Sequence, residues 1–400
     1  MTQILSLFAV LFALGTQSTQ VEDPRPFAPD AVLEPPGGPT LYLYTTGTSD
    51  VVALRVSVPL EERADEAGAA QILRALAAER MESVASRVGA RVRATRTPDA
   101  LVYEVAGPAS DMDFLAWILR EGMREPDASR FNQLRRDALA QVARRLETPE
   151  GALALRLRQA LEPATPPLHG TVPALERMGP QQVVDLWRRS HGRDRVRIVV
   201  VGNVQPEIVL ASLTDLGIPS SAPGSTASPG TPSGQPLPTP ELIRHWRAEA
   251  RLLPAGRDAR ALVATRLMAE MVRENPGDYE VGIELWEVDR NWVVVLSGAA
   301  YPRSRQAMDS RIDGLVREAA GRVSDDGVRR HAADLRAELL SSARTPWGLA
   351  DVVGHAMDAG EPPDRVEDLL DELARLRGPD LTRFLESLDE GSVIREAMNP

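Results

Sequence analysis

Residues 66–81 read EAGAAQILRALAAERM, an alanine-rich stretch with a glycine close to its start. Its apolar side chains recur every three or four residues, which is the period of one face of a helix. The pattern predicts an amphipathic helix over residues 66–86. Gln71, Arg74 and Ala75 are three and four residues apart, so this helix would carry them on one face.

Extended and helical patterns alternate on both sides of this helix. β-branched and apolar residues dominate 41–47 and 51–60, and 89–96 and 100–107 read as a strand pair around the turn Thr97-Pro98-Asp99. Periodic apolar residues then predict helices at 112–121, 129–146, 151–161 and 180–187, followed by a strand at 196–204.

A segment rich in Pro, Gly, Ser, Thr and Ala divides the chain at residues 217–239, GIPSSAPGSTASPGTPSGQPLPT. This composition cannot bury enough apolar surface to offset the entropy lost on ordering, so it predicts a linker. Beyond it the same order of elements returns, with strands near 242–253, 279–288 and 291–301 and helices at 259–273, 305–320, 325–342, 348–357 and 366–377. The repeat indicates an internal duplication. We expect an α+β protein with two homologous domains, 40–216 and 240–400, each a largely antiparallel sheet with helices packed on one face.

Length and composition limit the class of protein. A chain of 400 residues suits two domains of roughly 150–200 residues each. The net charge of −11 argues against a nucleic-acid partner, since binding to phosphates depends on an excess of Lys and Arg. The absence of cysteine excludes disulfides, a thiol nucleophile and cysteine-based metal sites.

The first residues, MTQILSLFAVLFALGTQSTQ (1–20), resemble an export signal. The apolar run 4–14 is too short to span a bilayer, and small polar residues follow it. An N-terminal core segment or a membrane anchor is the alternative. Residues 21–39 read as an extended Pro-rich leader. We therefore expect export to the periplasm or the extracellular space, with no membrane span in the mature chain.

Several segments in this order resemble the insulinase/pitrilysin family of zinc peptidases, in its two-domain bacterial form. GAAQILRAL (68–76) lies on the family motif G-x-A-H-x-x-E-H, and the segment 166–204 has the turn, helix and final strand that close the family's first half. VGARVRATRTPDALVYEV (88–105) matches a third segment through Gly89, Thr97, Asp99 and Tyr103, with Arg93 where Asn is usual. The resemblance extends from about 41 to about 388.

The departures from this family decide the expected function. Active members bind one zinc ion through two His on one helical face, and the Glu between them activates the metal-bound water. A second Glu on a later helix completes the coordination. The matching positions here hold Gln71, Arg74 and Ala75, and the later Glu falls on Gln141, with Asp137 and Glu147 as register alternatives.

These replacements remove the metal chemistry that the resemblance would otherwise imply. Gln is a poor zinc ligand, Ala is none, and a guanidinium repels the cation. The resemblance therefore implies no zinc or other cofactor and no peptidase activity of its own. It suggests a catalytically inactive subunit that pairs with a zinc-bearing homologous subunit and helps to bind peptide substrate. A stand-alone envelope scaffold or peptide-binding pseudopeptidase is the alternative, and a plain core helix is the simplest interpretation of residues 66–81.

A second segment keeps its family residues. In TRLMAEMVRENPGDYEVGIEL (265–285), Arg273 and Tyr279 match an Arg and a Tyr that reach the substrate beside the zinc in the family, if one residue is deleted before the Tyr. Arg offers a planar fork of donors to a peptide carbonyl or carboxylate, and a Tyr hydroxyl can donate to an oxyanion. The alternative is an Arg that favours a helix C-terminus and a strand Tyr that packs on the sheet. The resemblance thus suggests substrate binding by Arg273 and Tyr279.

Overall fold

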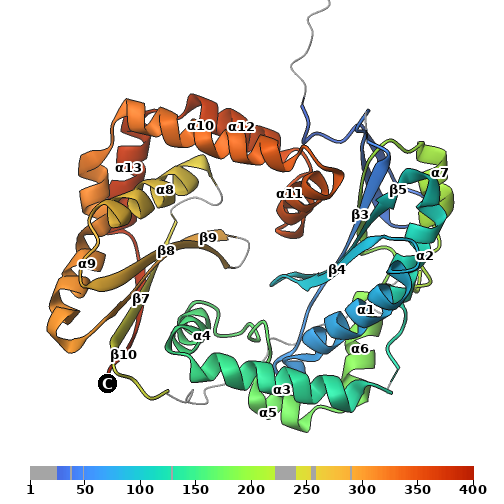
Figure 1. Cartoon of the computed structure of the whole chain (residues 1–400), viewed down its shortest axis with the longest axis horizontal. Coiled ribbons are helices and arrows are strands. Elements are labelled where there is room, and N and C mark those ends of the chain that lie inside the picture. The colour runs from blue at the N-terminus through green and yellow to red at the C-terminus, as the bar shows by residue number, and fades with distance from the viewer. Residues whose placement is uncertain are drawn as a thin grey trace, which may run out of the picture.

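The computed structural model describes residues 25–36, 38–47, 49–127, 129–220, 240–253, 258–288 and 291–400. The predicted signal at 1–20 and nearly all of the predicted linker lie outside these residues. Two halves, each built on a β-sheet with helices beside it, face one another (Figure 1). In this described part of the chain, no helix combines the length and the apolar character that crossing a bilayer requires.

The first half holds a six-stranded sheet in the order β1-β2-β6-β3-β5-β4. Its strands are β1 (Ala31–Leu33), β2 (Thr40–Tyr44), β3 (Val51–Pro59), β4 (Arg91–Arg96), β5 (Ala100–Pro108) and β6 (Arg197–Val201). Its helices are α1 (Ala69–Ala85), α2 (Met112–Met123), α3 (Phe131–Glu147), α4 (Pro149–Leu161), α5 (Val172–Arg177), α6 (Pro180–Ser190) and α7 (Pro206–Leu213). Only the pairing of β2 with β6 is parallel, and β4 forms an edge of the sheet.

The second half holds a four-stranded antiparallel sheet in the order β10-β7-β9-β8. Its strands are β7 (His245–Leu252), β8 (Tyr279–Val288), β9 (Asn291–Ala300) and β10 (Val393–Met398). Its helices are α8 (Ala259–Glu274), α9 (Arg305–Arg322), α10 (Asp325–Ser342), α11 (Pro346–Asp358), α12 (Arg365–Arg375) and α13 (Gly378–Glu390).

The two sheets share one topology. The strands β6-β3-β5-β4 of the first half and β10-β7-β9-β8 of the second occupy the same order, with α1 and α8 following β3 and β7 in the chain. This is the arrangement that an internal duplication produces. The prediction of an α+β protein with two largely antiparallel sheets and packed helices is confirmed.

Each half packs its own helices on one face of its sheet, and the other half supplies a helix for the second face. Helix α4 of the first half packs its apolar side on β7 and β10, and Leu153 and Leu157 share an apolar cluster with Ala250 and Val293 of the second sheet. Helix α11 of the second half packs on β3 and β6, where Val353 meets Ala53 and Val201 of the first sheet. Figure 1 shows both helices between the sheets. The sequence predicts the first kind of packing, while this exchange is seen only in the structure.

A buried ionic group fixes α11 on the first sheet. Arg55 of β3 is only 2% exposed, and its Nη2 donates to Asp358 Oδ2 of α11 over 2.7 Å. Its Nη1 donates to Ser57 Oγ over 2.6 Å, and Glu104 of β5 lies 3.6 Å from its Nε. Gly354 of α11 leaves room for this side chain, because a Cβ there would stand 2.5 Å from Arg55 Cδ. The halves are thus joined by charge as well as by apolar packing.

Candidate functional site

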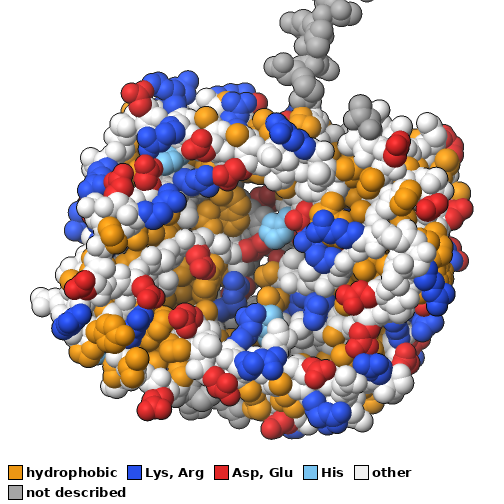
Figure 2. Space-filling model, in the orientation of Figure 1, with side chains coloured by type: hydrophobic (Ala, Val, Ile, Leu, Met, Phe, Trp, Pro, Cys, Tyr) orange, Lys and Arg blue, Asp and Glu red, His pale blue; other side chains and the backbone are white. Residues whose placement is uncertain are grey.

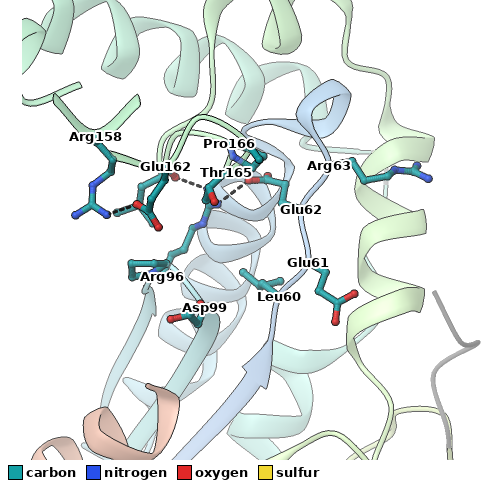
Figure 3. A pocket seen from close by; sticks show the side chains of 13 residues that line it. Leu60, Glu61, Glu62, Arg63, Arg96, Asp99, Arg158, Glu162, Thr165 and Pro166 are labelled. Atoms are coloured by element: carbon teal, nitrogen blue, oxygen red, sulfur yellow. Dashed lines mark hydrogen bonds and ion pairs between the residues drawn. The ribbon is translucent and has the colours of Figure 1, made fainter. Parts of the chain in front are cut away.

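The start of helix α1 is held by a carboxylate. Glu62 Oε1 accepts hydrogen bonds from the backbone N–H groups of Gly68 and Ala70, at 3.0 and 2.9 Å. Its Oε2 accepts from Arg96 Nη2 at 2.6 Å, at a pocket of about 270 Å³ (Figure 3). Gly68 has φ of 107°, a backbone conformation that glycine adopts without steric cost. These contacts fix the direction in which α1 presents its side chains.

The structure brings two of the predicted site residues together. Gln71 of α1 is buried, and its Nε2 donates to Gln141 Oε1 of α3 over 2.9 Å. Asp137 and Glu147, the other register choices, are exposed on α3. Ala75 is half-buried one turn after Gln71 and packs against the core of the first half. An amide pair and a methyl group therefore occupy this face of α1.

Arg74 completes this cluster with a positive charge. Its Nε donates to Gln71 Oε1 at 3.2 Å, and its Nη1 donates to the carbonyl of Ala94 on β4 at 3.4 Å. Burial lowers the pKa of Arg74, while Glu82 acts in the opposite direction. Both acceptors are neutral. Within the described residues Arg74 has no ion pair.

The carbonyl that Arg74 reaches points away from the sheet. Thr97 N–H donates to Ala100 O, which makes that pair a hydrogen-bonded one in the β4–β5 hairpin. Hydrogen-bonded and non-hydrogen-bonded pairs alternate along antiparallel strands. Ala94, opposite Tyr103, therefore directs its backbone groups to the open edge of β4. The guanidinium of Arg74 lies at that edge.

His169 adds a neutral ring near the same place. Burial, together with the charges of Arg145, Arg96 and Arg74, lowers its pKa to about 4. Its Nδ1 is buried and has no hydrogen-bond partner in the described part of the chain. His169 and Arg145 were not among the sequence-predicted site residues, although Arg145 follows Gln141 by four residues and shares its helix face.

The cluster does not fit a zinc ion. Zinc requires imidazole, thiolate or carboxylate donors with free lone pairs in tetrahedral positions. The Gln71 amide is already engaged on both its oxygen and its nitrogen, and Arg74 brings a positive charge to the place. Across the described residues, no three His, Cys, Asp or Glu side chains are grouped as a metal site needs.

Arg273 and Tyr279 lie in the second half. Arg273 is exposed in the last turn of α8 and lines a hollow of about 590 Å³ together with Glu270 and His331. All residues that line this hollow belong to the second half. Tyr279, the first residue of β8, is half-buried against the apolar core of its own half, and its ring covers Gly277. The hollow does not include the cluster at α1.

The face seen in Figure 2 is hollowed between the two halves, and cationic side chains lie along the rim on the side of the first half. The two halves meet where Arg158 Nη1 of α4 donates to the backbone carbonyl of Glu287 on β8 over 2.9 Å. Within the second half, His355 Nε2 of α11 lies 3.9 Å from Glu287 Oε2.

No protein-family profile and no curated protein matches the chain. Solved structures do. A protease from Helicobacter pylori superposes with a TM-score of 0.76 at 14% identity, covering 93% of this chain and 100% of that one. The peptidase M16 inactive domain from Pseudomonas fluorescens gives 0.73 at 12% identity, covering 91% and 97%. The periplasmic protease PqqL from Escherichia coli gives 0.72 at 12% identity and 99% coverage of this chain, which spans 49% of PqqL.

These likenesses establish architecture. They cover both halves of the chain, because the matched share exceeds nine-tenths in each case. The chain has the two-half fold of the M16 peptidases, as its resemblance to the insulinase/pitrilysin family predicts.

Proposed function

We propose that the chain is a non-catalytic, peptidase-like subunit that pairs with a zinc-bearing homologue and helps to bind its peptide substrate. The observation that carries this proposal is the hydrogen bond between Gln71 and Gln141 with Arg74 beside it. By the resemblance to the family, this amide pair and guanidinium stand at the positions where an active member carries its metal ligands and its general base.

The preserved fold supports a role that needs the shape without the chemistry. Helix α1 keeps its anchored start and its buried apolar face, with Ile72, Leu73 and Leu76 in the core. One solved structure of the same fold is an inactive domain of an M16 peptidase. A chain that keeps this fold without zinc ligands could still bind peptide as the partner of a catalytic chain.

The test combines metal content with assembly. The purified chain is expected to hold no stoichiometric zinc. It is also expected to leave unstructured peptides uncleaved, both with and without a chelator. Co-expression with an H-x-x-E-H homologue from the same genome is expected to give a joint peak of one chain each on gel filtration with light scattering. One zinc per chain would contradict the non-catalytic assignment. Separate peaks would contradict the pairing and favour a stand-alone scaffold or peptide-binding protein.

We also propose export, which rests on residues 1–20 and on the likeness to a protease described as periplasmic. A cell expressing the full chain is expected to release it with the periplasmic or extracellular fraction. Deletion of residues 2–20 should retain it in the cytoplasm. Equal distribution of the two forms would contradict the proposal.

A further inference from the structure

Positively charged side chains converge where the fold's metal site would lie. Gln71 and Arg74 come from α1, while Gln141 and Arg145 come from the facing side of α3. Arg145 lies one turn after Gln141 on α3, and Arg96 Nη1 donates to the carbonyl of Leu168, the residue before His169. The charges of Arg145, Arg96 and Arg74 all lower the pKa of His169. Their arrangement differs from a solvated basic surface because Arg74 is half-buried between α1 and β4.

The charges in this group are unequally compensated. Arg96 is paired with Glu62 at 2.6 Å, and both side chains are at most 5% exposed. Among the described residues, Arg74 donates only to the neutral oxygens of Gln71 and Ala94. Arg145 is exposed, and neither it nor Arg74 forms an ion pair with any described residue. A half-buried guanidinium without a counter-ion is costly, and an anion from outside the chain would offset that cost.

The remaining groups favour an anion over a cation or a neutral ligand. His169 is neutral at pH 7, and its buried Nδ1 has no hydrogen-bond partner among the residues that the structure describes. As Nδ1–H it could donate to an oxygen, in which case its tautomer would be set by the ligand. Guanidinium groups present a planar fork that matches a carboxylate in a two-point contact.

We propose that Arg74 and Arg145, with His169 beside them, form a binding site for a carboxylate of an extended peptide. The carboxylate is either an acidic side chain or the peptide C-terminus. This inference rests on the proposed peptide-binding role and names the chemical class that it selects. The positive charge that makes the place unfit for zinc makes it fit for an anion.

The test uses the purified chain alone and three peptides of one unstructured sequence. The first carries a central Glu and an amidated C-terminus, the second has Gln in place of that Glu, and the third is the Gln peptide with a free C-terminal carboxylate. Calorimetric titration at low salt measures the affinity for each. Arg74→Gln and Arg145→Gln are compared with Arg336→Gln, which removes the same charge from an exposed position on α10 of the other half.

The wild-type chain is expected to prefer one of the two carboxylate peptides over the amidated Gln peptide by about tenfold or more. A preference for the Glu peptide identifies the side chain as the source, and a preference for the free C-terminus identifies the terminus. Arg74→Gln should abolish the preference, Arg145→Gln should reduce it, and Arg336→Gln should leave it unchanged. Higher salt should weaken it as well.

Equal affinity for all three peptides, or no binding of any of them at millimolar concentration, would overturn the proposal. A preference that survives in both Arg74→Gln and Arg145→Gln would also overturn it. If Arg74→Gln does not fold, Arg145→Gln decides, because its exposed side chain contributes little to stability. These titrations do not depend on the zinc and assembly measurements. If the chain pairs with a catalytic subunit but does not prefer carboxylates, only the carboxylate proposal fails.

Discussion

Gln71 Nε2 of α1 donates a hydrogen bond to Gln141 Oε1 of α3 over 2.9 Å, joining two side chains that are 70 residues apart in the sequence. The resemblance to the insulinase/pitrilysin family implies that a metal ion would join the matching two helices in an active relative. Here they are joined directly, and the amide oxygen of Gln71 also accepts from Arg74. The contact therefore contributes to the stability of the first half.

A double-mutant cycle measures that contribution. Gln71→Ala and Gln141→Ala should each lower the free energy of unfolding, and the two losses should couple by about 0.5–1.5 kcal/mol, the net value of one intramolecular hydrogen bond. Urea unfolding of the four proteins gives the coupling. Gln133→Ala, at an exposed position on α3, serves as the control and should add independently to Gln71→Ala. Strict additivity of the first pair would show that the bond is absent in solution.

Restoring the family ligands should restore a metal site. The variant Gln71→His, Arg74→Glu, Ala75→His and Gln141→Glu places two imidazoles four residues apart on α1, with a carboxylate within reach on α3. It is expected to bind about one zinc ion per chain, as measured by equilibrium dialysis with metal analysis. The same variant with Arg74 left in place should bind zinc more weakly, since the guanidinium opposes the cation. Failure of the fourfold variant to retain zinc while folded would show that α1 and α3 are not held in the family's geometry.

Gly354 should be intolerant of even one methyl group. A Cβ there would stand 2.5 Å from Arg55 Cδ and 2.7 Å from its Nε, and Arg55 is locked by its buried pair with Asp358. Gly354→Ala should therefore lower the free energy of unfolding by about 1–3 kcal/mol through overpacking. Gly314→Ala is the matched control in α9, where a Cβ meets nothing within 4 Å, and it should raise stability by about 0.5–1 kcal/mol. Thermal or urea unfolding distinguishes the opposite signs.

Stability should fall as the pH falls below about 6.5. His191 is fully buried between Tyr103 and Ser190, and burial lowers its pKa to about 3, with a backbone contact to Trp187 acting in the opposite direction. Below pH 6.5 the unfolded chain takes up a proton at this histidine and the folded chain does not. The loss amounts to at most about 1.4 kcal/mol per pH unit and continues down to pH 3.

The control for this pH effect is His191→Gln, which removes the titrating ring. Urea unfolding at pH 7.0, 6.0 and 5.5 should give a shallower decline for this variant than for the wild type, even if the variant is less stable at every pH. A residual slope is expected from His169, whose pKa is lowered to about 4. Equal slopes in the two proteins would contradict the assignment of the effect to His191.

Arg273 and Tyr279 are expected to matter only in an assembled complex with a catalytic partner. Arg273→Ala should weaken peptide binding by about 1.5–3 kcal/mol through loss of a charge-assisted contact. Tyr279→Phe keeps the ring that packs over Gly277 and should spare folding, but it should lower turnover by about a hundredfold if its hydroxyl donates to an oxyanion. Arg329→Ala, on the exposed face of α10, is the control. Undiminished peptidase rates of an assembled double variant would refute the role.

Local signals were sufficient for most of the fold. The prediction of a helix at 325–342 matches α10, whose start is marked by Ser324 accepting from Gly327 N–H and by two following aspartates. Strand β10 was not predicted, because Arg395 and Glu396 interrupt its apolar pattern and its pairing with β7 depends on residues far away in the chain. Helices α7 and α13 also escaped prediction, although α13 buries an apolar face that includes Phe384 and Leu388.

The site was predictable only along single helices. Spacing placed Gln71, Arg74 and Ala75 on one face, since helical geometry is local. The contact with Gln141 rested on a family alignment with two register alternatives, and the approach of His169 depends on a loop whose path no local pattern specifies. The exchange of α4 and α11 could not be predicted either. An amphipathic sequence pattern indicates that a helix packs through one face, but it does not indicate which sheet the helix packs on.

Because of the exchange of α4 and α11, neither half encodes all the helices that cover its own sheet. A helix of each half covers one face of the other half's sheet. A core mutation in one half therefore disturbs the packing of the other half as well. We expect the two repeats to have diverged together, with substitutions in α4 matched by changes in β7 and β10, and substitutions in α11 matched by changes in β3 and β6. If the coding sequence were split at the linker, neither polypeptide would fold when expressed alone. The two would fold into one complex when expressed together.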